Sequence, residues 1–328
     1  MTLPVVLVSH QPPDPIRDAF CGVLAGAAEV LFLPDLSDAA RQDALHNARA
    51  VLTYHPIRDL GAEALGRLEN CGLMQCLTAG IDYLSFDDLP DHIDVAYNAG
   101  AYAEPMAEHV AAMALSASKR LAGEHRLMQA GEFNQFVPTK KIAGATCGIL
   151  GFGETGREVA RLMRALGMNI QAINRSGKTD EPVDFIGTLD DMDRVLAAVD
   201  VFVITIALTK KTDSLIRAAQ LSRMKPDAIL INVARGEIVD EDDLYAHLVA
   251  NPGFTACLEA WWIEPVRHGK FETKHPFLDL PNVIASPHNS AMTDGALITA
   301  AQRGAENVLR FLNGETPRFV AGDDVRMA

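Results

Sequence analysis

Cysteine, aromatic residues and positive charge are all scarce in this sequence of 328 residues, of which 6% are aromatic. The five cysteines form no C-x-x-C pair, and their odd number indicates free thiols in a reducing compartment, without disulfides or a metal site. Lys and Arg total 29 against 43 Asp and Glu, so the formal net charge is −14. A protein this acidic is not expected to bind nucleic acid or an anionic membrane surface.

Hydrophobic segments long enough to cross a membrane are also missing. No run reaches about 18 apolar residues, the length that a spanning helix needs. The first residues lack the basic and long apolar regions of a signal peptide. We therefore expect a cytoplasmic protein without a membrane partner.

The rest of the composition is that of an ordinary globular protein, with 48% hydrophobic and 22% charged residues. At about 100–200 residues per domain, the length predicts two domains. Short apolar runs alternate with helical patterns along the chain, which is typical of parallel β-α-β units with helices on both faces of a sheet. Strands are expected at 5–8, 30–33, 51–54, 73–77 and 93–97, and helices at 14–25, 37–46 (capped by Ser37) and 62–68.

A long helix is expected over 104–130, and Gly131 and Pro138 interrupt the pattern after it. A second series of strands and helices follows, and a last helix over 292–312 ends the pattern. The strands of this series are expected at 146–150, 169–173, 201–206, 228–233, 255–258 and 283–285.

The second series opens with a glycine-rich turn, Gly151-Phe152-Gly153-Glu154-Thr155-Gly156, directly after an apolar strand and at the start of an amphipathic helix. In this context the G-x-G-x-x-G pattern predicts a dinucleotide site. Gly151 permits the tight turn, Gly153 lets the backbone approach a pyrophosphate, and Gly156 lets the helix pack against the strand. The N–H groups at the helix start, from Glu154 and Thr155 onward, would face the phosphates.

The end of the next strand indicates which nucleotide binds. An NAD site would place a carboxylate there to accept from the ribose hydroxyls. This sequence instead has Asn174-Arg175-Ser176, where Arg175 would pair with a 2′-phosphate and Ser176 would donate to it. NADP(H) is therefore predicted over NAD(H), and the alternative is a solvated Arg175 with Asn174 serving the 2′-hydroxyl.

Three charged residues follow the carboxyl ends of later strands, at the edge where open α/β sheets bind ligands. They are Arg235 after the strand at 228–233, Glu264 after the strand at 255–258, and His288 after the strand at 283–285. Reduction of a 2-keto acid needs a cation for the substrate, an acid for the developing alkoxide and a carboxylate that keeps this acid charged. These three residue types supply those needs.

With these motifs the chain resembles the D-isomer-specific 2-hydroxyacid dehydrogenases. The glycine turn, the segment Asn232–Asp240 (N-x-A-R-G-x-x-V-D), Glu264-Pro265 and Pro287-His288 occur in the family order. The resemblance covers about residues 76–314. It implies two Rossmann-like, doubly wound parallel-sheet domains with a cleft between them.

Residue roles follow from the same resemblance. His288 would be the acid/base, Glu264 its partner and Arg235 the substrate-binding cation. The main chain at Ala79 and Gly80 would grip the substrate carboxylate. Ala234 and Glu259 would belong to the cofactor site, although the family often has Asp where Glu259 stands, one methylene shorter.

The resemblance also implies the division of the chain and its assembly. Residues 1–100 with 292–328 would form the substrate domain, residues 101–291 the dinucleotide-binding domain, and two chains a homodimer. The implied activity is reduction of a small 2-keto acid, such as glyoxylate or hydroxypyruvate, to the D-2-hydroxy acid with NADP(H) or NAD(H).

Other functions and several residues stay open at this point. A phosphite or formate dehydrogenase of the same family is one alternative, although formate enzymes usually have Gln where Glu264 stands. A nucleotide-sensing corepressor-like protein is another. The roles of Trp261, Trp262, Tyr54 and His55 are undecided between a pocket, an interface and simple packing.

Overall fold

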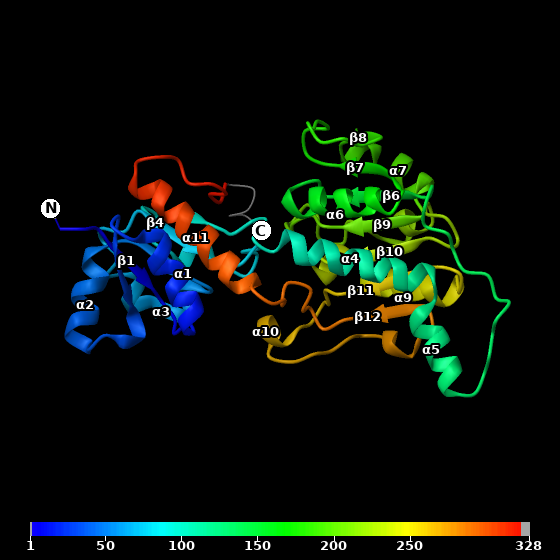
Figure 1. The fold of residues 1–328 in the computed structure, drawn as a ribbon, viewed down its shortest axis with the longest axis horizontal. Helices are drawn as coiled ribbons and strands as arrows, with labels where there is room; N and C mark the ends of the chain where they lie inside the picture. Colours follow the sequence, from blue (N-terminus) through cyan, green and yellow to red (C-terminus); the bar gives the residue numbers. More distant parts are fainter. Residues whose placement is uncertain (1, 323–328) are drawn as a thin grey trace. The chain divides into compact units, whose positions relative to one another are not determined.

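The computed structural model describes residues 2–322 of the chain. The chain divides into two compact units, and Figure 1 colours them along the sequence. Unit 1 comprises residues 1–102 and 292–328, and unit 2 comprises residues 103–291. Residues 1 and 323–328, which the sequence assigns to the substrate domain, lie outside the described residues.

Unit 1 is built on a five-stranded sheet with the order β2-β1-β3-β4-β5, and all of its named strand pairs are parallel. Because β1 leads to β2 on one side and β3 lies on its other side, the sheet is doubly wound. The strands are β1 (Val5–Val8), β2 (Glu29–Phe32), β3 (Ala48–Thr53), β4 (Leu73–Cys76) and β5 (Asp94–Ala96). The helices are α1 (Asp14–Leu24), α2 (Asp38–Asn47), α3 (Pro56–Leu65) and α11 (Ala296–Leu312).

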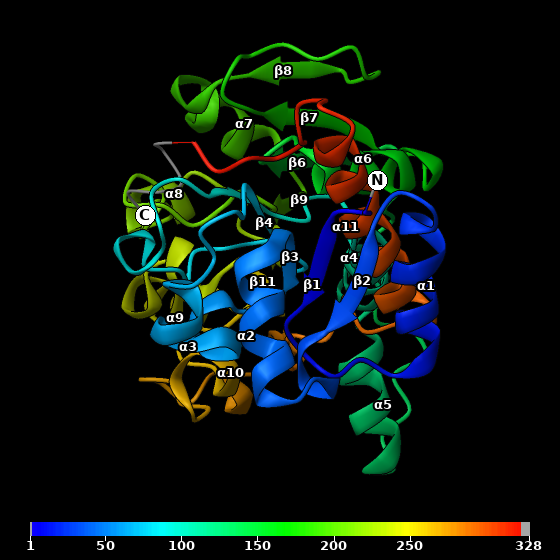
Figure 2. The ribbon, with the colours of Figure 1, turned by 90° about the vertical axis from the view of Figure 1, so that its left-hand side faces the viewer.

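Alternating side chains of the unit 1 strands enter two separate cores. Val6 and Val8 pack with residues of α1 and α11, whereas Leu7 packs with residues of α2 and α3. Figure 2 shows α1 and α11 side by side, with α2 and α3 on the other side of β1. A strand buried on both faces must be apolar at every position, which explains the continuous run Val5–Val8.

Unit 2 contains a seven-stranded sheet with the order β12-β11-β10-β9-β6-β7-β8, again parallel throughout. Both sheets therefore confirm the predicted doubly wound α/β class. The strands are β6 (Thr146–Leu150), β7 (Asn169–Ile173), β8 (Phe185–Gly187), β9 (Val201–Ile204), β10 (Ile229–Asn232), β11 (Thr255–Leu258) and β12 (Val283–Ala285). The helices are α4 (Ala103–Ser118), α5 (Leu121–Gln129), α6 (Glu154–Ala165), α7 (Met192–Ala198), α8 (Ala218–Leu221), α9 (Glu241–Ala250) and α10 (Pro265–His268).

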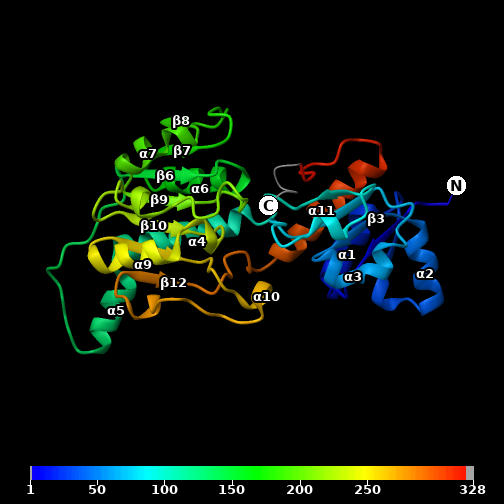
Figure 3. The same ribbon diagram turned by 180° about the vertical axis from the view of Figure 1, so that it is seen from behind.

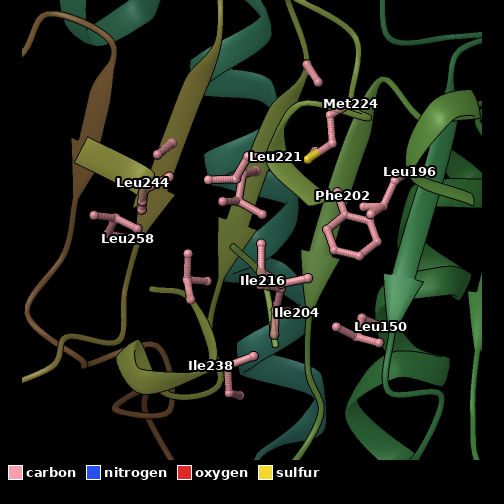
Figure 4. Close-up of a cluster of buried hydrophobic side chains, with 14 of the residues drawn as sticks. Leu150, Leu196, Phe202, Ile204, Ile216, Leu221, Met224, Ile238, Leu244 and Leu258 are labelled. Carbon is pink, nitrogen blue, oxygen red and sulfur yellow. The ribbon is translucent and has the colours of Figure 1, made fainter. Parts of the chain in front are cut away.

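Helices cover both faces of the unit 2 sheet. Helices α4 and α6 lie over the face nearer the viewer in Figure 1, and α9 lies over the opposite face, seen in Figure 3. Figure 4 shows the core under α7, α8 and α9, where Phe202, Ile204 and Leu150 project from β9 and β6. These cores fix the strand ends from which the candidate site is built.

Three predicted helices need correction, and one strand was not predicted. The single helix expected over 104–130 is wrong: α4 ends at Ser118 and α5 begins at Leu121, because Arg120 takes a left-handed conformation with φ of 55°. The last helix begins at Ala296, not 292, because Gly295 precedes it with φ of 77°.

The helix expected over 62–68 spans Pro56–Leu65, with a kink at Gly61, where φ is 78°. The strand β8 was not predicted, because three residues at a sheet edge carry too short a pattern.

The cysteines behave as buried or isolated thiols. Cys71, Cys76, Cys147 and Cys257 are buried, and burial raises the pKa of each to about 12, so they stay protonated. Over residues 2–322, no helix combines the length and apolar character needed to cross a membrane.

Candidate active site

The glycine turn lies at the end of β6, where the connections of the unit 2 sheet reverse direction. Gly151 has φ of 100°, and a Cβ there would come within 2.5 Å of the Ile206 nitrogen. A Cβ at Gly156 would meet the Gly151 oxygen at 2.3 Å, whereas a Cβ at Gly153 would meet nothing within 4 Å. The first and third glycines are therefore required by the fold, and Gly153 lines open space.

Helix α6 begins at Glu154, directly after this turn. Its first internal hydrogen bond comes from the Arg157 nitrogen to the Gly153 oxygen, at 3.0 Å. The preceding N–H groups, those of Glu154, Thr155 and Gly156, lack a turn of helix before them and point out of its N-terminus. The Glu154 side chain pairs with Arg157 at 3.7 Å, so the main chain of Glu154 is the part suited to a phosphate.

The loop after β7 is folded by Asn174. Its Oδ1 accepts from the nitrogens of Ser176 and Gly177 at 3.1 and 2.7 Å, and its Nδ2 donates to the Lys178 oxygen at 2.8 Å. These bonds employ both ends of the amide, so Asn174 shapes the loop after β7. Arg175 and Ser176 are exposed on the loop that results.

Arg235 follows β10 and is positioned by Asn232, the first residue of the N-x-A-R-G segment. The buried Asn232 side chain accepts from the Ala234 nitrogen at 3.1 Å and donates to the Arg235 oxygen at 2.7 Å. A Cβ at Gly236 would come within 2.3 Å of the Trp261 carbonyl carbon. This explains why the segment needs Asn at its start and Gly after the arginine.

Glu264 and His288 form the central contact of the site. The His288 Nδ1 lies 2.8 Å from both Glu264 oxygens. Glu264 is 7% exposed, whereas the His288 side chain is 34% exposed, with Nδ1 engaged by the carboxylate. The Nε2 atom on the other edge of the ring is therefore the one suited to give a proton to a substrate.

The two residues shift each other's pKa. Burial alone would lower the pKa of His288, but the Glu264 hydrogen bond and the charges of Glu259 and Glu264 outweigh burial and an opposing Arg235 charge. The pKa of His288 is therefore raised above its usual 6.5. Burial would raise the pKa of Glu264, yet the hydrogen bond and charge of His288, with smaller help from Trp261 and Arg235, hold it below 4.5.

Glu259 is a second carboxylate beside His288. It is 0% exposed, its Oε1 accepts from the Ser290 nitrogen at 2.8 Å, and its Oε2 lies 3.9 Å from the His288 Nε2. Within the described part of the chain this Oε2 has no hydrogen-bond partner. A buried carboxylate oxygen without a donor fits a ligand that brings an N–H group, as the carboxamide of a nicotinamide does.

The structure thus brings Arg235, Glu259, Glu264 and His288 together at the carboxyl ends of the neighbouring strands β10, β11 and β12. Ala79 and Gly80 follow β4 in unit 1 and are half-buried there. His55 has a structural task in unit 1, where its Nδ1 accepts from the Arg58 nitrogen at the start of α3, at 3.3 Å.

Sequence reasoning left Trp261 undecided and overlooked His109. The Trp261 Nε1 donates to the Ser286 oxygen at 2.8 Å, and the His109 Nε2 lies 3.0 Å from the Ser286 Oγ, two residues before His288. No spacing in the sequence indicates either contact, because His109 comes from α4, far away along the chain.

Similarity to known proteins agrees with this geometry. The family model "D-isomer specific 2-hydroxyacid dehydrogenase, NAD binding domain" matches residues 111–290. D-3-phosphoglycerate dehydrogenase from Archaeoglobus fulgidus is 30% identical over 256 residues, which are 77% of this chain but 47% of that protein. This chain thus corresponds to about half of that relative.

Two further relatives are matched over a larger share of their own length. Hydroxypyruvate reductase from Thermotoga maritima is 31% identical over 246 residues, covering 74% of this chain and 78% of that protein. The crystal structure of a glycerate dehydrogenase related protein from Thermoplasma acidophilum superposes with a TM-score of 0.68 at 29% identity, covering 94% of this chain and 99% of that one. The chain belongs to the D-isomer specific 2-hydroxyacid dehydrogenases, a family of oxidoreductases that act on CH–OH donors with a nicotinamide cofactor.

Proposed function

We propose that this protein reduces a small 2-keto acid, such as glyoxylate or hydroxypyruvate, to the D-2-hydroxy acid with NADPH. The observation that carries the proposal is the 2.8 Å contact between Glu264 and His288, beside Arg235 in the sheet that also bears the glycine turn. The named relatives, one of them a hydroxypyruvate reductase, support the substrate class.

In this mechanism His288 acts as the acid. Its Nε2 gives a proton to the substrate oxygen while Nδ1 stays bonded to Glu264, whose negative charge favours the imidazolium form beforehand. The guanidinium of Arg235 pairs with the substrate carboxylate and polarises the carbonyl group. In the oxidising direction the same Nε2 takes the proton from the hydroxyl group.

When bound, a nicotinamide cofactor would supply the hydride for the keto carbon. The residues that would hold it are the main chain of Gly151–Gly156 at the pyrophosphate, Ala234 in the adjacent loop, and Glu259 at the carboxamide. Arg175 and Ser176 would bind the 2′-phosphate, on a loop that Asn174 shapes and that carries no carboxylate at its tip.

Unit 1 would be the substrate domain and unit 2 the dinucleotide-binding domain. The loop after β4 would contribute the main-chain N–H groups of Ala79 and Gly80 to the substrate carboxylate.

We also propose a homodimer formed through unit 2. Helix α5 and the segment after it project from the unit 2 sheet (Figures 1 and 3). They expose large apolar side chains, and a soluble protein normally buries such a cluster against a partner. These side chains are Leu121 (57% exposed), Met128 (54%), Phe133 (72%), Phe136 (91%) and Val137 (41%).

His288→Ala tests the function most directly. With glyoxylate or hydroxypyruvate and NADPH, the natural protein should consume reduced cofactor, and the variant should lose about 10²–10⁴-fold in kcat because its general acid is gone. NADPH binding, followed by cofactor fluorescence, should persist. The control is His46→Ala, an exposed histidine of unit 1. Near-normal kcat in the His288 variant would refute the assignment.

Glu264→Gln should change the pH dependence of reduction. Reduction needs protonated His288, so kcat/KM falls as pH rises through the pKa of His288, which Glu264 raises. Removing the carboxylate's charge lowers that pKa, and the falling limb should move to lower pH by about one unit or more. Glu272→Gln, an exposed carboxylate paired with Lys270, should leave the limb in place. An unmoved limb in Glu264→Gln would contradict the electrostatic role of this residue.

Arg175→Ala tests the choice of cofactor. Loss of a charge-assisted contact to the 2′-phosphate, worth about 1.5–3 kcal/mol, should lower kcat/KM for NADPH by about 10–100-fold. The value for NADH should change by less than about threefold, so NADH serves as the internal control. A natural protein that prefers NADH, or a variant that loses both cofactors equally, would exclude this use of Arg175.

Phe136→Asp tests the dimer. The natural protein should sediment at twice the chain mass of 35.4 kDa, and the variant should sediment as a monomer at micromolar concentration, because a charge is placed in the apolar interface. Val249→Asp alters another exposed apolar side chain (57%), on α9, and should stay dimeric. A monomeric natural protein would rule out the proposed assembly.

A further inference from the structure

Trp261 contacts both backbone segments that carry the acid/base pair. It lies between β11 and α10 and is 3% exposed. Its main-chain nitrogen donates to the Glu264 Oε1 at 2.7 Å, and its indole Nε1 donates to the Ser286 oxygen at 2.8 Å. The first bond orients the carboxylate, and the second holds the chain two residues before His288.

The backbone at His288 needs such support. His288 has φ of 52°, in the left-handed region that a residue with a side chain adopts only when its surroundings impose it. Pro287, just before it, has no N–H to anchor the turn. The turn is instead held at its two ends, by Ser286 before His288 and by Ser290 after it. The Ser290 nitrogen donates to Glu259 at 2.8 Å.

Ser286 is therefore the anchor on which the approach to His288 depends. Its nitrogen donates to the Leu258 oxygen at 3.0 Å, its Oγ lies 3.0 Å from the His109 Nε2, and its oxygen accepts from the Trp261 indole at 2.8 Å. Trp261 contributes the bond that joins this anchor to the segment bearing Glu264. The Trp261 indole thus adds a direct side-chain link between the segment of the carboxylate and the segment of the imidazole, beyond the pairing of β11 with β12.

The segment after Glu264 in turn fixes the indole ring. Phe271 meets Trp261 edge to face, with ring centroids 5.2 Å apart and an interplanar angle of 89°. An isolated bridge between Ile263 and Glu272 folds the segment back, and the His268 Nδ1 accepts from the Glu264 nitrogen at 3.0 Å. The loop 266–274 therefore closes over Trp261 and leaves its ring one orientation.

We propose that Trp261 is a positioning residue for the acid/base pair: it holds the Glu264 carboxylate and the Ser286–His288 turn in register, so that the contact persists while His288 gains and loses its proton. The proposal rests on the proposed function, in which His288 is the acid. Trp261, whose role the sequence leaves undecided, would act through Glu264 and the Ser286–His288 turn and would not contact the substrate.

Trp262 offers a matched control. It is 9% exposed, and its Nε1 donates at the same 2.8 Å to a backbone carbonyl, that of Val239. It also packs on an aromatic ring, Phe277, with centroids 5.2 Å apart. Replacing either tryptophan by Phe removes one indole N–H from a buried site, but only the bond of Trp261 reaches the segment of His288.

The experiment compares Trp261→Phe with Trp262→Phe in the full chain. The pKa of His288 is measured by NMR titration of the imidazole without substrate, and kcat and KM are measured with NADPH and the best 2-keto acid. For Trp261→Phe we expect the pKa of His288 to fall by about half a unit or more and kcat by about tenfold, with KM for NADPH within about twofold. For Trp262→Phe we expect a similar loss in Tm but an unchanged pKa and kcat.

Phe271→Ala provides a second test of the proposal in case Trp261→Phe does not fold. Phe271 is 49% exposed, so its truncation costs little of the core, but it frees the indole ring. The pKa of His288 should fall in this variant too, by less than in Trp261→Phe.

Either of two results would overturn the proposal. In the first, the pKa of His288 is the same in Trp261→Phe as in Trp262→Phe. In the second, neither Trp261→Phe nor Phe271→Ala changes the pKa of His288 from its value in the natural protein. The titration needs no substrate, so it separates this outcome from failure of the proposed function, which His288→Ala would reveal through retained turnover.

Discussion

A buried carboxylate and a half-buried imidazole stabilise each other's charged forms in this protein, and the site is organised around that contact. Glu264 is almost fully enclosed and would be costly to ionise alone. His288 supplies the opposite charge at 2.8 Å. The contact exists because β11 and β12 are neighbours and parallel, so that the chain leaves both at one edge of the sheet. Strand order, set by apolar cores on both faces, therefore decides the chemistry that this edge performs.

The charged residues around His288 act on its pKa in opposite directions. Glu259 and Glu264 raise the pKa of His288, and Arg235 lowers it, while the same arginine favours ionised Glu264. A guanidinium close enough to bind a substrate carboxylate would by itself discourage a protonated histidine. The second carboxylate, Glu259, offsets this effect. With two carboxylates and one arginine around it, His288 therefore keeps a raised pKa in spite of the guanidinium charge.

Much of the fold and of the candidate site could be predicted from the sequence, and the features that were not predicted have physical explanations. The glycine turn and the three charged strand ends were predictable because local backbone geometry and parallel strand order dictate them. The break at Arg120 was not, since a left-handed residue other than glycine depends on packing that no periodic pattern records. The bonds by which Asn174 shapes its own loop were not predicted either, because the sequence alone does not show which partners a side-chain amide has. The bonds among Trp261, Ser286 and His109 join three distant segments and emerge only from the fold.

Under the proposed function, substrate choice and acid/base chemistry are encoded in different sheets. The carboxyl edge of the unit 1 sheet is held by its own bonds: the Asp59 Oδ2 accepts from the nitrogens of Tyr54 and His55 at 3.2 and 2.9 Å and from the Thr53 Oγ1 at 3.0 Å. The Tyr83 hydroxyl joins the Tyr54 oxygen to the Thr78 hydroxyl, so the loops after β3 and β4 are braced against each other. None of these bonds involves Glu264 or His288. Side chains on the braced loops can therefore change the acids that are accepted while the pair that moves the proton stays as it is, because the two are stabilised by separate cores.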